Sequence, residues 1–436
     1  MIQIAAPFGV KGDRQYVTPQ FGKSNACNSA LNANFAEGLR WQTIHPRPKC
    51  GQTETRSQAT LQSVNDSAFS QLSYDPKNED QELLKHALKP TLTVAVSGAA
   101  GQIAQHLLFM LASGGCFGMD QPIAFRLLAS RQESLAPLEG MAMELEDSLY
   151  PLLRKVEIGN EPLTMFRDAD WAVLLGAVPR AAGTERAHLL DINGQIYQEQ
   201  GRALNEVASR DCKVLVVGNP CNTNALICME NAPRLQRRNF HALMRLDENR
   251  ARCQLAHKAQ RFYTAITNLC VWGNHSTTQV PDFLNAHIGG EPAMEVVQDE
   301  QWFRHDFTPT VAGRGGEIAS RLERSPAAST AVAVADAVKS LVEPTAEGEC
   351  FSSAVCTDGN PYGIREGLIC SMPCWSQGEG RYHVCDDFAI DDWLREKILE
   401  SEDELIRERE CVSHLLPNAE PAACRIMRET SLPGES

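Results

Sequence analysis

The sequence contains no apolar run as long as the roughly 18 to 20 residues that a membrane-spanning helix needs. Its 15 cysteines include no Cys-x-x-Cys pair and do not form the dense framework of a small secreted domain. Most of them are expected to be buried small hydrophobes, and we assign no metal site. Basic residues are outnumbered, 41 against 55 acidic ones, and the formal net charge of -14 argues against a general affinity for nucleic acid or acidic membranes.

Acidic residues are scarce in residues 1–60, which hold three of them against seven Lys and Arg, together with scattered Ser, Asn, Gln and Thr. This composition is typical of an organelle transit peptide. A disordered tail without a targeting role has the same composition and stays an alternative. The segment lacks the long apolar region of a secretory signal, so it does not predict secretion. We therefore assign residues 1–80 to a transit peptide and N-terminal extension.

The rest of the chain is organised around residues 91–108, TLTVAVSGAAGQIAQHLL. Their apolar spacing predicts a strand and then a helix, with a tight turn at Gly98 and Gly101 between them. Such a junction directs backbone N–H groups and the positive end of a helix dipole at one point, where a phosphate can bind. Ala104 stands where the dinucleotide-binding fingerprint has its third small residue, although a glycine pair after a strand can also be an ordinary turn. No Gly-Lys-Ser/Thr follows, so the sequence disfavours a P-loop nucleotide hydrolase.

Strands and helices alternate from residue 91 to about 246. Apolar runs predict further strands at 123–128, 171–175 and 214–217, and helical periodicity appears at 138–150 and 194–208. This alternation predicts an α/β fold with a doubly wound parallel sheet of the Rossmann type. Ligands of such sheets bind beyond the carboxyl ends of the strands, so the residues that follow each strand are the candidates for function.

The strand at 123–128 is followed by Ser130 and Arg131, where a cofactor with a free ribose 2′-hydroxyl would call for an acidic residue. A hydroxyl and a guanidinium suit a 2′-phosphate, because arginine offers a fixed fork of donors to phosphate oxygens. The two residues favour NADP over NAD if the glycine turn binds a dinucleotide. Without that turn they would be an ordinary solvated loop.

The strand at 171–175 is followed by a loop of small residues that contains Arg180 and Arg186. Two arginines there could bind a dicarboxylate, one for each carboxylate, or could be ordinary surface residues. The Gly and Ala content of the loop predicts a movable lid that excludes water when it closes. Asn219, after the strand at 214–217, could donate to a substrate oxygen or could belong to an Asn-Pro turn.

His275 lies in the segment VWGNHSTTQ, directly after a predicted strand. An imidazole in this place could accept the hydroxyl proton as hydride leaves the substrate, and could return that proton in the reduction. A buried carboxylate such as Asp247 could hold the tautomer of the imidazole and stabilise the imidazolium. A single histidine is more often structural than catalytic, so this role needs support from elsewhere in the chain.

That support is a resemblance. The segments GAAGQI, GNPCNTNALIC, RLDENRA, WGNHSTTQVPDF, NPYGI and CVSHL, in this order, resemble the lactate/malate dehydrogenase family, and within it the thioredoxin-regulated, NADP-dependent malate dehydrogenases of chloroplasts. The resemblance extends over about residues 90–436. It implies a Rossmann-type domain followed by an α+β substrate-binding catalytic domain. It also implies a homodimer of the plastid stroma that reduces oxaloacetate to malate with NADPH.

The resemblance also implies roles for individual residues. His275 would be the proton donor and acceptor, Asp247 its partner, and the substrate would be bound by Arg180, Arg186, Asn219 and Arg250. The residues at the cofactor would be Gly98, Ala99, Ala100, Gly101, Gln102, Ile103, Ala104, Ser130, Arg131, Asn193, Gln200, Val217, Gly218 and Asn219. Ser329 would be a further substrate contact in a segment where Pro326 departs from the plant pattern.

The C-terminal residues form a second region with a specific resemblance. The family implies that Cys411 and Cys424, which bracket 12 residues, form a disulfide that thioredoxin reduces. Closing a loop of this size is worth roughly 3 kcal/mol of chain entropy. The family also implies an autoinhibitory tail, in which Glu435 and the terminal carboxylate imitate a dicarboxylate at Arg180 and Arg186. Two idle thiols in a disordered acidic tail are the alternative.

Cys27 and Cys50 are 23 residues apart and do not match the closely spaced N-terminal pair of land-plant members, so we infer no N-terminal switch. These inferences divide the chain into an extension at 1–80, an NADP-binding domain at 81–246, a catalytic domain at 247–400 and a redox-regulatory extension at 401–436. Two other functions stay open. One is an unregulated, NAD-dependent malate or 2-hydroxy-acid dehydrogenase, and the other is a catalytically silent redox-responsive binding protein.

Overall fold

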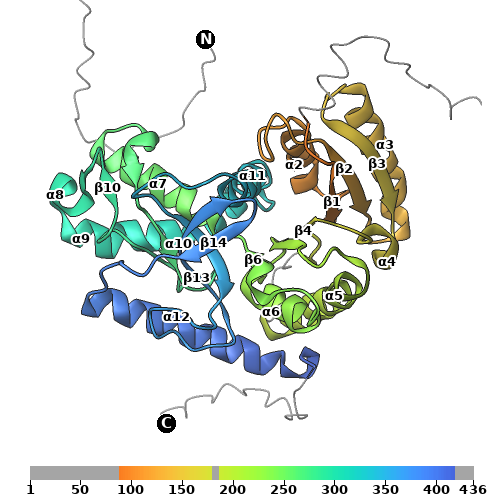
Figure 1. The fold of residues 1–436 in the computed structure, drawn as a ribbon. Coiled ribbons are helices and arrows are strands. Elements are labelled where there is room, and N and C mark those ends of the chain that lie inside the picture. Colours follow the sequence, from red (N-terminus) through yellow and green to blue (C-terminus); the bar gives the residue numbers. More distant parts are fainter. Residues whose placement is uncertain (1–87, 179–185, 418–436) are drawn as a thin grey trace, which may run out of the picture. The chain divides into compact units, whose positions relative to one another are not determined.

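A computed structural model describes residues 88–178 and 186–417 (Figure 1). The predicted transit peptide at 1–80, the lid residue Arg180 and the predicted tail residues Cys424 and Glu435 lie outside these ranges. Within the described residues, no helix is long and apolar enough to cross a membrane.

The first half of the described chain alternates strands and helices, as predicted. In order they are β1 (Leu92–Ser97), α2 (Gln102–Ala112), β2 (Ile123–Leu128), α3 (Leu135–Asp147), β3 (Leu153–Gly159), α4 (Pro162–Met165), β4 (Trp171–Leu174), α5 (Arg186–Val207), β5 (Lys213–Val216), α6 (Cys221–Glu230) and β6 (Phe240–Ala242). The six strands are parallel and lie in the order β3-β2-β1-β4-β5-β6. This is the strand order of a Rossmann sheet. Successive strands are added on one side of β1 up to β3, and from β4 onward they are added on its other side. The predicted fold class is confirmed.

The second half extends the same sheet and adds two small ones. Its elements are α7 (Arg245–Ala259), β7 (Ile266–Thr267), β8 (Val271–Trp272), β9 (Val280–Pro281), β10 (His287–Ile288), β11 (Glu291–Pro292), α8 (Ala293–Val297), α9 (Glu300–Trp302), a π-helical turn (Phe303–Phe307), α10 (Thr308–Leu322), α11 (Ala328–Val342), β12 (Phe351–Cys356), β13 (Ile369–Gly378), β14 (Arg381–Val384) and α12 (Asp392–Cys411). β12 pairs antiparallel with β6, and β13 and β14 follow, so the main sheet has nine strands. β8 pairs with β9, and the third sheet has the order β11-β10-β7. Short 3₁₀ turns occur at Gln132–Ser134, Arg237–Asn239, Tyr263–Ala265 and Ser413–Leu415.

Three predicted strands match β2, β4 and β5 closely, whereas β3 and β6 were not predicted. β3 has the sequence LRKVEIG, and none of its residues is fully buried. An edge strand with three charged side chains lacks the apolar run by which the inner strands were identified. β6 has only three residues, which is too short for a periodicity to appear.

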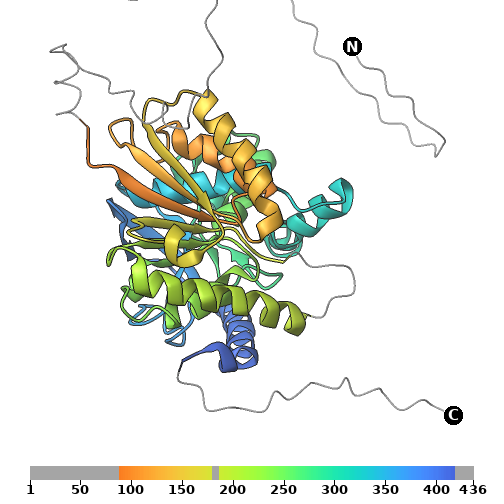
Figure 2. The ribbon, with the colours of Figure 1, turned by 90° about the vertical axis from the view of Figure 1, so that its right-hand side faces the viewer.

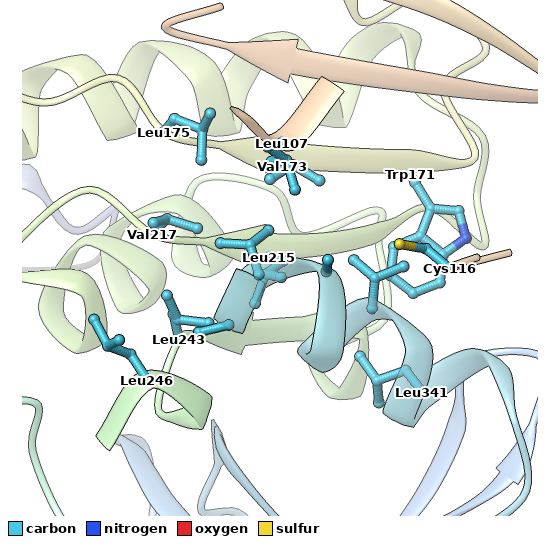
Figure 3. Packing of buried hydrophobic residues seen from close by; sticks show 14 of the residues in the cluster. Leu107, Cys116, Trp171, Val173, Leu175, Leu215, Val217, Leu243, Leu246 and Leu341 are labelled. Atoms are coloured by element: carbon cyan, nitrogen blue, oxygen red, sulfur yellow. The ribbon is translucent and has the colours of Figure 1, made fainter. Parts of the chain in front are cut away.

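The core shows why β1 is central. Val94, Ala95 and Val96 are all 0% exposed, so both faces of this strand are covered. Because successive side chains alternate, Val94 and Val96 join one apolar cluster with α2, while Ala95 joins another with α5 and α6. Figure 3 shows part of the first cluster, to which α11 of the second half contributes Leu341. The second half therefore helps to bury the first, and the domain boundaries at 246 and 400 stay predictions.

Helix α12 packs against elements of both halves of the described chain. It contacts α5 and α6 of the first half and β9 and β13 of the second. Figure 2 shows this blue helix below the green helices of the first half. Its N-terminus is capped by Asp391, whose carboxylate accepts a hydrogen bond from the backbone N–H of Leu394 at 2.7 Å. Its last residue is Cys411.

Candidate active site

The glycine turn after β1 leaves a backbone surface that fits a phosphate. Gly98 has a φ of +66°, and a Cβ atom there would lie 2.7 Å from the Cα atom of Gly176, in the loop after β4. Gly101 is the N-cap residue of α2, and among the described residues no side chain caps this helix. Its first N–H groups are therefore available to an anion. Ala104 is 0% exposed, which agrees with the predicted close packing of helix and sheet.

Ser130 and Arg131 lie beside this turn, at the carboxyl end of β2. A Cβ atom at Gly176 would lie 3.6 Å from Ser130 Oγ, so the serine borders the same loop that touches Gly98. Both side chains are exposed. Their place suits recognition of the ribose end of a dinucleotide, which the Rossmann fold binds after its second strand.

Asn193 of α5 ties two loops of the site together. Its Oδ1 atom accepts from the backbone N–H of Val178 at 2.7 Å, and its Nδ2 atom donates to the carbonyls of Val178 at 3.2 Å and Asn219 at 2.9 Å. The side chain is fully buried, so in this structure it positions the loops after β4 and β5. Asn219 is exposed beside it.

Two further predicted cofactor residues differ in what the structure says of them. Gly218 has no room for a side chain, because a Cβ atom would overlap with Tyr197 Oη and would lie 2.8 Å from Ala177 Cβ. Gln200 is 7% exposed, and its Oε1 atom has no hydrogen-bond partner within the described residues. A contact of Gln200 with a cofactor stays a prediction.

The substrate arginines are only partly visible. Arg180 lies outside the described residues, and Arg186 begins α5, but its side chain is not among those described. Ser329 is exposed in the first turn of α11. The assignment of these residues to the substrate stays a prediction.

The structure brings His275 and Asp247 into direct contact, although they are 28 residues apart in sequence. His275 Nδ1 lies 2.5 Å from Asp247 Oδ2. Asp247 is 0% exposed in the first turn of α7, where the helix dipole favours a negative charge. Because Nδ1 is bound to the carboxylate, the Nε2 atom of His275 is the nitrogen left for a substrate.

Arg250 completes this group from the next turn of α7. Its Nη1 atom donates to Asp247 Oδ1 at 2.7 Å, so the carboxylate lies between an arginine and a histidine. Burial raises the pKa of Asp247, but the charge and hydrogen bond of His275 and the charge of Arg250 outweigh it, and the pKa is lowered overall. The carboxylate is therefore ionised at neutral pH.

Arg250 also lies against a glycine of α10. A Cβ atom at Gly315 would lie 3.2 Å from Arg250 Nη2, so the guanidinium rests directly on this helix. Its Nε atom is buried and has no partner within the described residues. A buried donor without an acceptor is unusual, and a carboxylate is the ligand that a guanidinium binds best.

One residue that binds the backbone of His275 was not predicted from the sequence. Asn222 of α6 is 0% exposed, and its Oδ1 atom accepts the backbone N–H of His275 at 3.0 Å. Its Nδ2 atom donates to the carbonyl of Ile369 in β13 at 3.0 Å. Asn222 is part of the GNPCNTN segment, but an asparagine inside a helix gives no local sign of such a role.

Comparisons with known proteins show which family this chain belongs to. The family model described as the NAD binding domain of lactate/malate dehydrogenase matches residues 92–241, and that of the alpha/beta C-terminal domain matches residues 244–416. The chain belongs to the lactate/malate dehydrogenase family. It contains that family's nicotinamide-cofactor domain and its alpha/beta C-terminal domain.

Several individual proteins show which members of the family this chain resembles. The chain is 59% identical over 362 residues to malate dehydrogenase [NADP] 1, chloroplastic, of Sorghum bicolor, which covers 83% of this chain and 83% of that protein. It is 56% identical to the chloroplastic malate dehydrogenase [NADP] of Spinacia oleracea, over 83% of this chain and 82% of the relative. Among solved structures, malate dehydrogenase of Naegleria fowleri is 41% identical with a TM-score of 0.73, covering 76% of this chain and all of that one.

Proposed function

We propose that this protein catalyses the reversible reduction of oxaloacetate to malate with NADPH. The observation that carries the proposal is the contact between His275 and the buried, ionised Asp247, which lies on α7, the helix that follows β6 of the Rossmann sheet. The names of the relatives support the same substrate and cofactor, since they are malate dehydrogenases marked NADP.

The protein's own residues carry the proton. When bound, NADPH supplies the hydride that reduces the ketone carbon of the substrate. His275, as the imidazolium, donates the proton on Nε2 to the ketone oxygen. Its Nδ1–H remains hydrogen-bonded to the carboxylate of Asp247 throughout. The ionised Asp247 stabilises the imidazolium and fixes the orientation of its ring. In the direction of malate oxidation the neutral Nε2 takes the hydroxyl proton back.

Arginines account for the preference for a dicarboxylate. Arg250 is held by Asp247 and lies beside His275, where it can bind the carboxylate next to the reacting carbon. In our proposal Arg180, from the segment after β4, and Arg186, the first residue of α5, bind the substrate, and Arg186 selects the second carboxylate. Asn219 donates to a substrate oxygen, and closure of the loop excludes water.

Residues of the first half of the described chain, from β1 to the loop after β5, bind the cofactor in this proposal. The backbone of Gly98–Ala104 takes the pyrophosphate, and Ser130 and Arg131 bind the 2′-phosphate that distinguishes NADP from NAD. Asn193, Gln200 and Val217–Asn219 border the path toward the nicotinamide. The turn fits this group, because Gly98 leaves its backbone bare and α2 lacks a side-chain cap within the described residues.

The redox switch is also a proposal. Cys411 is exposed at the end of α12, and Cys424 follows outside the described residues. We infer that their disulfide holds the acidic tip with Glu435 at the substrate arginines until thioredoxin reduces it. The curated relatives are chloroplastic, so we place the protein in the plastid stroma and expect a homodimer there.

The histidine provides the test of the chemistry. His275→Asn in the reduced protein is expected to lower the kcat of oxaloacetate reduction by roughly 100- to 10,000-fold, because the proton donor is lost. The dissociation constant for NADPH, measured by fluorescence titration, should stay within about twofold. Retained turnover in this variant would refute the proposed mechanism.

The cysteine provides the test of the switch. Oxidised wild-type protein should gain activity on incubation with reduced thioredoxin. Cys411→Ser should be active without it. Exposed Cys253, which is distant in sequence from the tail, offers a control as Cys253→Ser that should still need reduction. A Cys411→Ser variant that still depends on thioredoxin would show that this pair is not the switch.

A further inference from the structure

Three side chains of α12 face the loop that carries His275. Ser401, Glu404 and Glu408 are spaced three and four residues apart, so they lie on one face of the helix. Ser401 is 0% exposed and Glu408 is 4% exposed. Carboxylates in such surroundings need hydrogen-bond donors, and here the donors come from both sides of the histidine.

Asn274, the residue before His275, directs its donors at this helix. Its backbone N–H donates to Ser401 Oγ at 2.7 Å. Its Nδ2 group donates to Glu404 Oε2 at 3.0 Å and to Glu408 Oε1 at 3.1 Å. Asn274 is 1% exposed, so both carboxylates share one buried amide.

The loop touches α12 at further places. Thr278 Oγ1 donates to Glu404 Oε2 at 2.7 Å, and Ser276 Oγ donates to the same oxygen. Gly273 has a φ of +93°, and a Cβ atom there would lie 2.7 Å from the Cβ atom of Ser401. The helix therefore rests on the backbone of the loop itself.

Glu408 is also linked to His275 indirectly, through α6. Its second carboxylate oxygen accepts from Thr223 Oγ1 of α6. The neighbouring Asn222 accepts the backbone N–H of His275 at 3.0 Å. One buried carboxylate thus holds the residue before His275 and the helix turn that holds His275 itself.

We propose that Glu404 and Glu408 are positioning residues for His275. They fix the loop so that His275 Nδ1 stays against Asp247, and they touch neither substrate nor cofactor. Within the described part of the chain, the charged groups joined directly to this imidazole cluster are Asp247 and Arg250 of α7, and the two glutamates of α12 contact the loop that carries it. This inference deepens the proposed function and rests on it for the reaction, but the geometry of His275 can be measured without turnover.

The test compares Glu408→Gln, Glu404→Gln and Asn274→Ala in the full-length reduced protein. Glu408→Gln keeps the shape of glutamate but sets an NH₂ group where either Asn274 or Thr223 needs an acceptor, because each of them uses a different oxygen of Glu408. Glu404→Gln removes the negative charge from the one oxygen that accepts from Asn274, Ser276 and Thr278, which weakens these hydrogen bonds. The readouts are the downfield proton resonance of the Nδ1–H bond between His275 and Asp247, assigned with His275→Asn, and the kinetics of oxaloacetate reduction. Asp403→Asn is the matched control, because this carboxylate is exposed on the same helix.

We expect each of the three variants to weaken or broaden the resonance and to lower kcat about tenfold or more, since a displacement of about 1 Å can cost about 100-fold in rate. The KM for oxaloacetate should change less than about twofold, and Asp403→Asn should match the wild type. If Glu408→Gln does not fold, Thr278→Val removes one contact with Glu404 and should show a smaller change of the same kind.

Two results would overturn the inference. In one, the resonance and kcat stay at wild-type values in folded variants, which would make these contacts merely structural. In the other, the glutamine variants lose activity but Asn274→Ala does not, so that the carboxylates do not act through the loop. Wild-type protein that shows the resonance but does not reduce oxaloacetate would refute the proposed function alone, because the resonance still tests the positioning.

Discussion

The two halves of the candidate site are built by opposite means. The catalytic half consists of buried, paired side chains, with Asp247 at 0% exposure between His275 and Arg250. The cofactor half depends on side chains that are absent, as at Gly98, and on exposed ones such as Arg131. Substitutions in the catalytic half should therefore lower kcat, whereas those in the cofactor half should weaken cofactor binding.

The largest effect outside His275 itself is expected at Asp247. Asp247→Asn removes the charge that stabilises the imidazolium and presents an amide to Nδ1, so kcat should fall on the order of 100-fold or more. The KM for NADPH should stay within about twofold. Steady-state kinetics of the reduced protein would measure both, and a kcat within threefold of wild type would remove Asp247 from the mechanism.

The glycine turn offers the opposite test. Gly98→Ala adds a Cβ atom at a positive φ and 2.7 Å from backbone, so the turn must distort. The dissociation constant for NADPH should rise more than about tenfold. Gly140→Ala is the control, because that glycine lies in α3 with nothing within 4 Å of the added atom. Equal NADPH binding by Gly98→Ala and Gly140→Ala would contradict the role of the turn.

The exposed residues of the cofactor half should show a smaller, selective effect. Arg131→Ala should raise the KM for NADPH about tenfold, since a hydrogen bond to a charged group is worth roughly 1.5 to 3 kcal/mol. The KM for NADH should change little. Arg154→Ala, an exposed arginine of β3, is the matched control. Equal changes for the two cofactors would mean that Arg131 does not read the 2′-phosphate.

A buried histidine that belongs to neither the catalytic half nor the cofactor half of the site gives a third case for the comparison. Its substitution should change the stability of the protein without changing kcat or cofactor binding. His241 of β6 is 1% exposed and lies 3.0 Å from Ser353 Oγ. Burial, followed by the charges of Lys213 and Arg238, lowers its pKa to about 3. The unfolded chain therefore binds more protons than the folded protein between about pH 3 and the ordinary histidine pKa of about 6.5.

The sign follows from this difference. The free energy of unfolding should fall as the pH falls through that window, by on the order of 1 kcal/mol per pH unit from this group. Denaturant unfolding at pH 7, 6 and 5 would measure the slope, and His241→Gln should flatten it while leaving the KM values unchanged. An unchanged slope in the variant would show that His241 is not the group responsible.

The sequence predicted the parts of the fold that have local signals. β2, β4 and β5 were found because inner strands of a parallel sheet are continuous apolar runs, and the turn at Gly98 because glycine marks it. β3 was missed because an edge strand can carry charges. The addition of β12, β13 and β14 to the sheet was missed because it depends on pairing between residues more than 100 positions apart.

The candidate site shows the same limit. His275, Asp247 and Arg250 were identified through motifs, and the structure brings all three together. The contact of Asn274 with Glu408 joins residues 134 positions apart, and neither residue carries a local sign of it. Contacts of this kind follow from the packing of α12, which no periodicity reveals.

The measurement that tests the central claim most directly is oxaloacetate reduction by the protein lacking the predicted transit peptide, with NADPH and NADH in parallel, before and after reduction by thioredoxin. We predict activity that prefers NADPH and appears on reduction. Activity that prefers NADH would contradict the role of Ser130 and Arg131, and absence of oxaloacetate turnover in the fully reduced protein would contradict the proposed function itself.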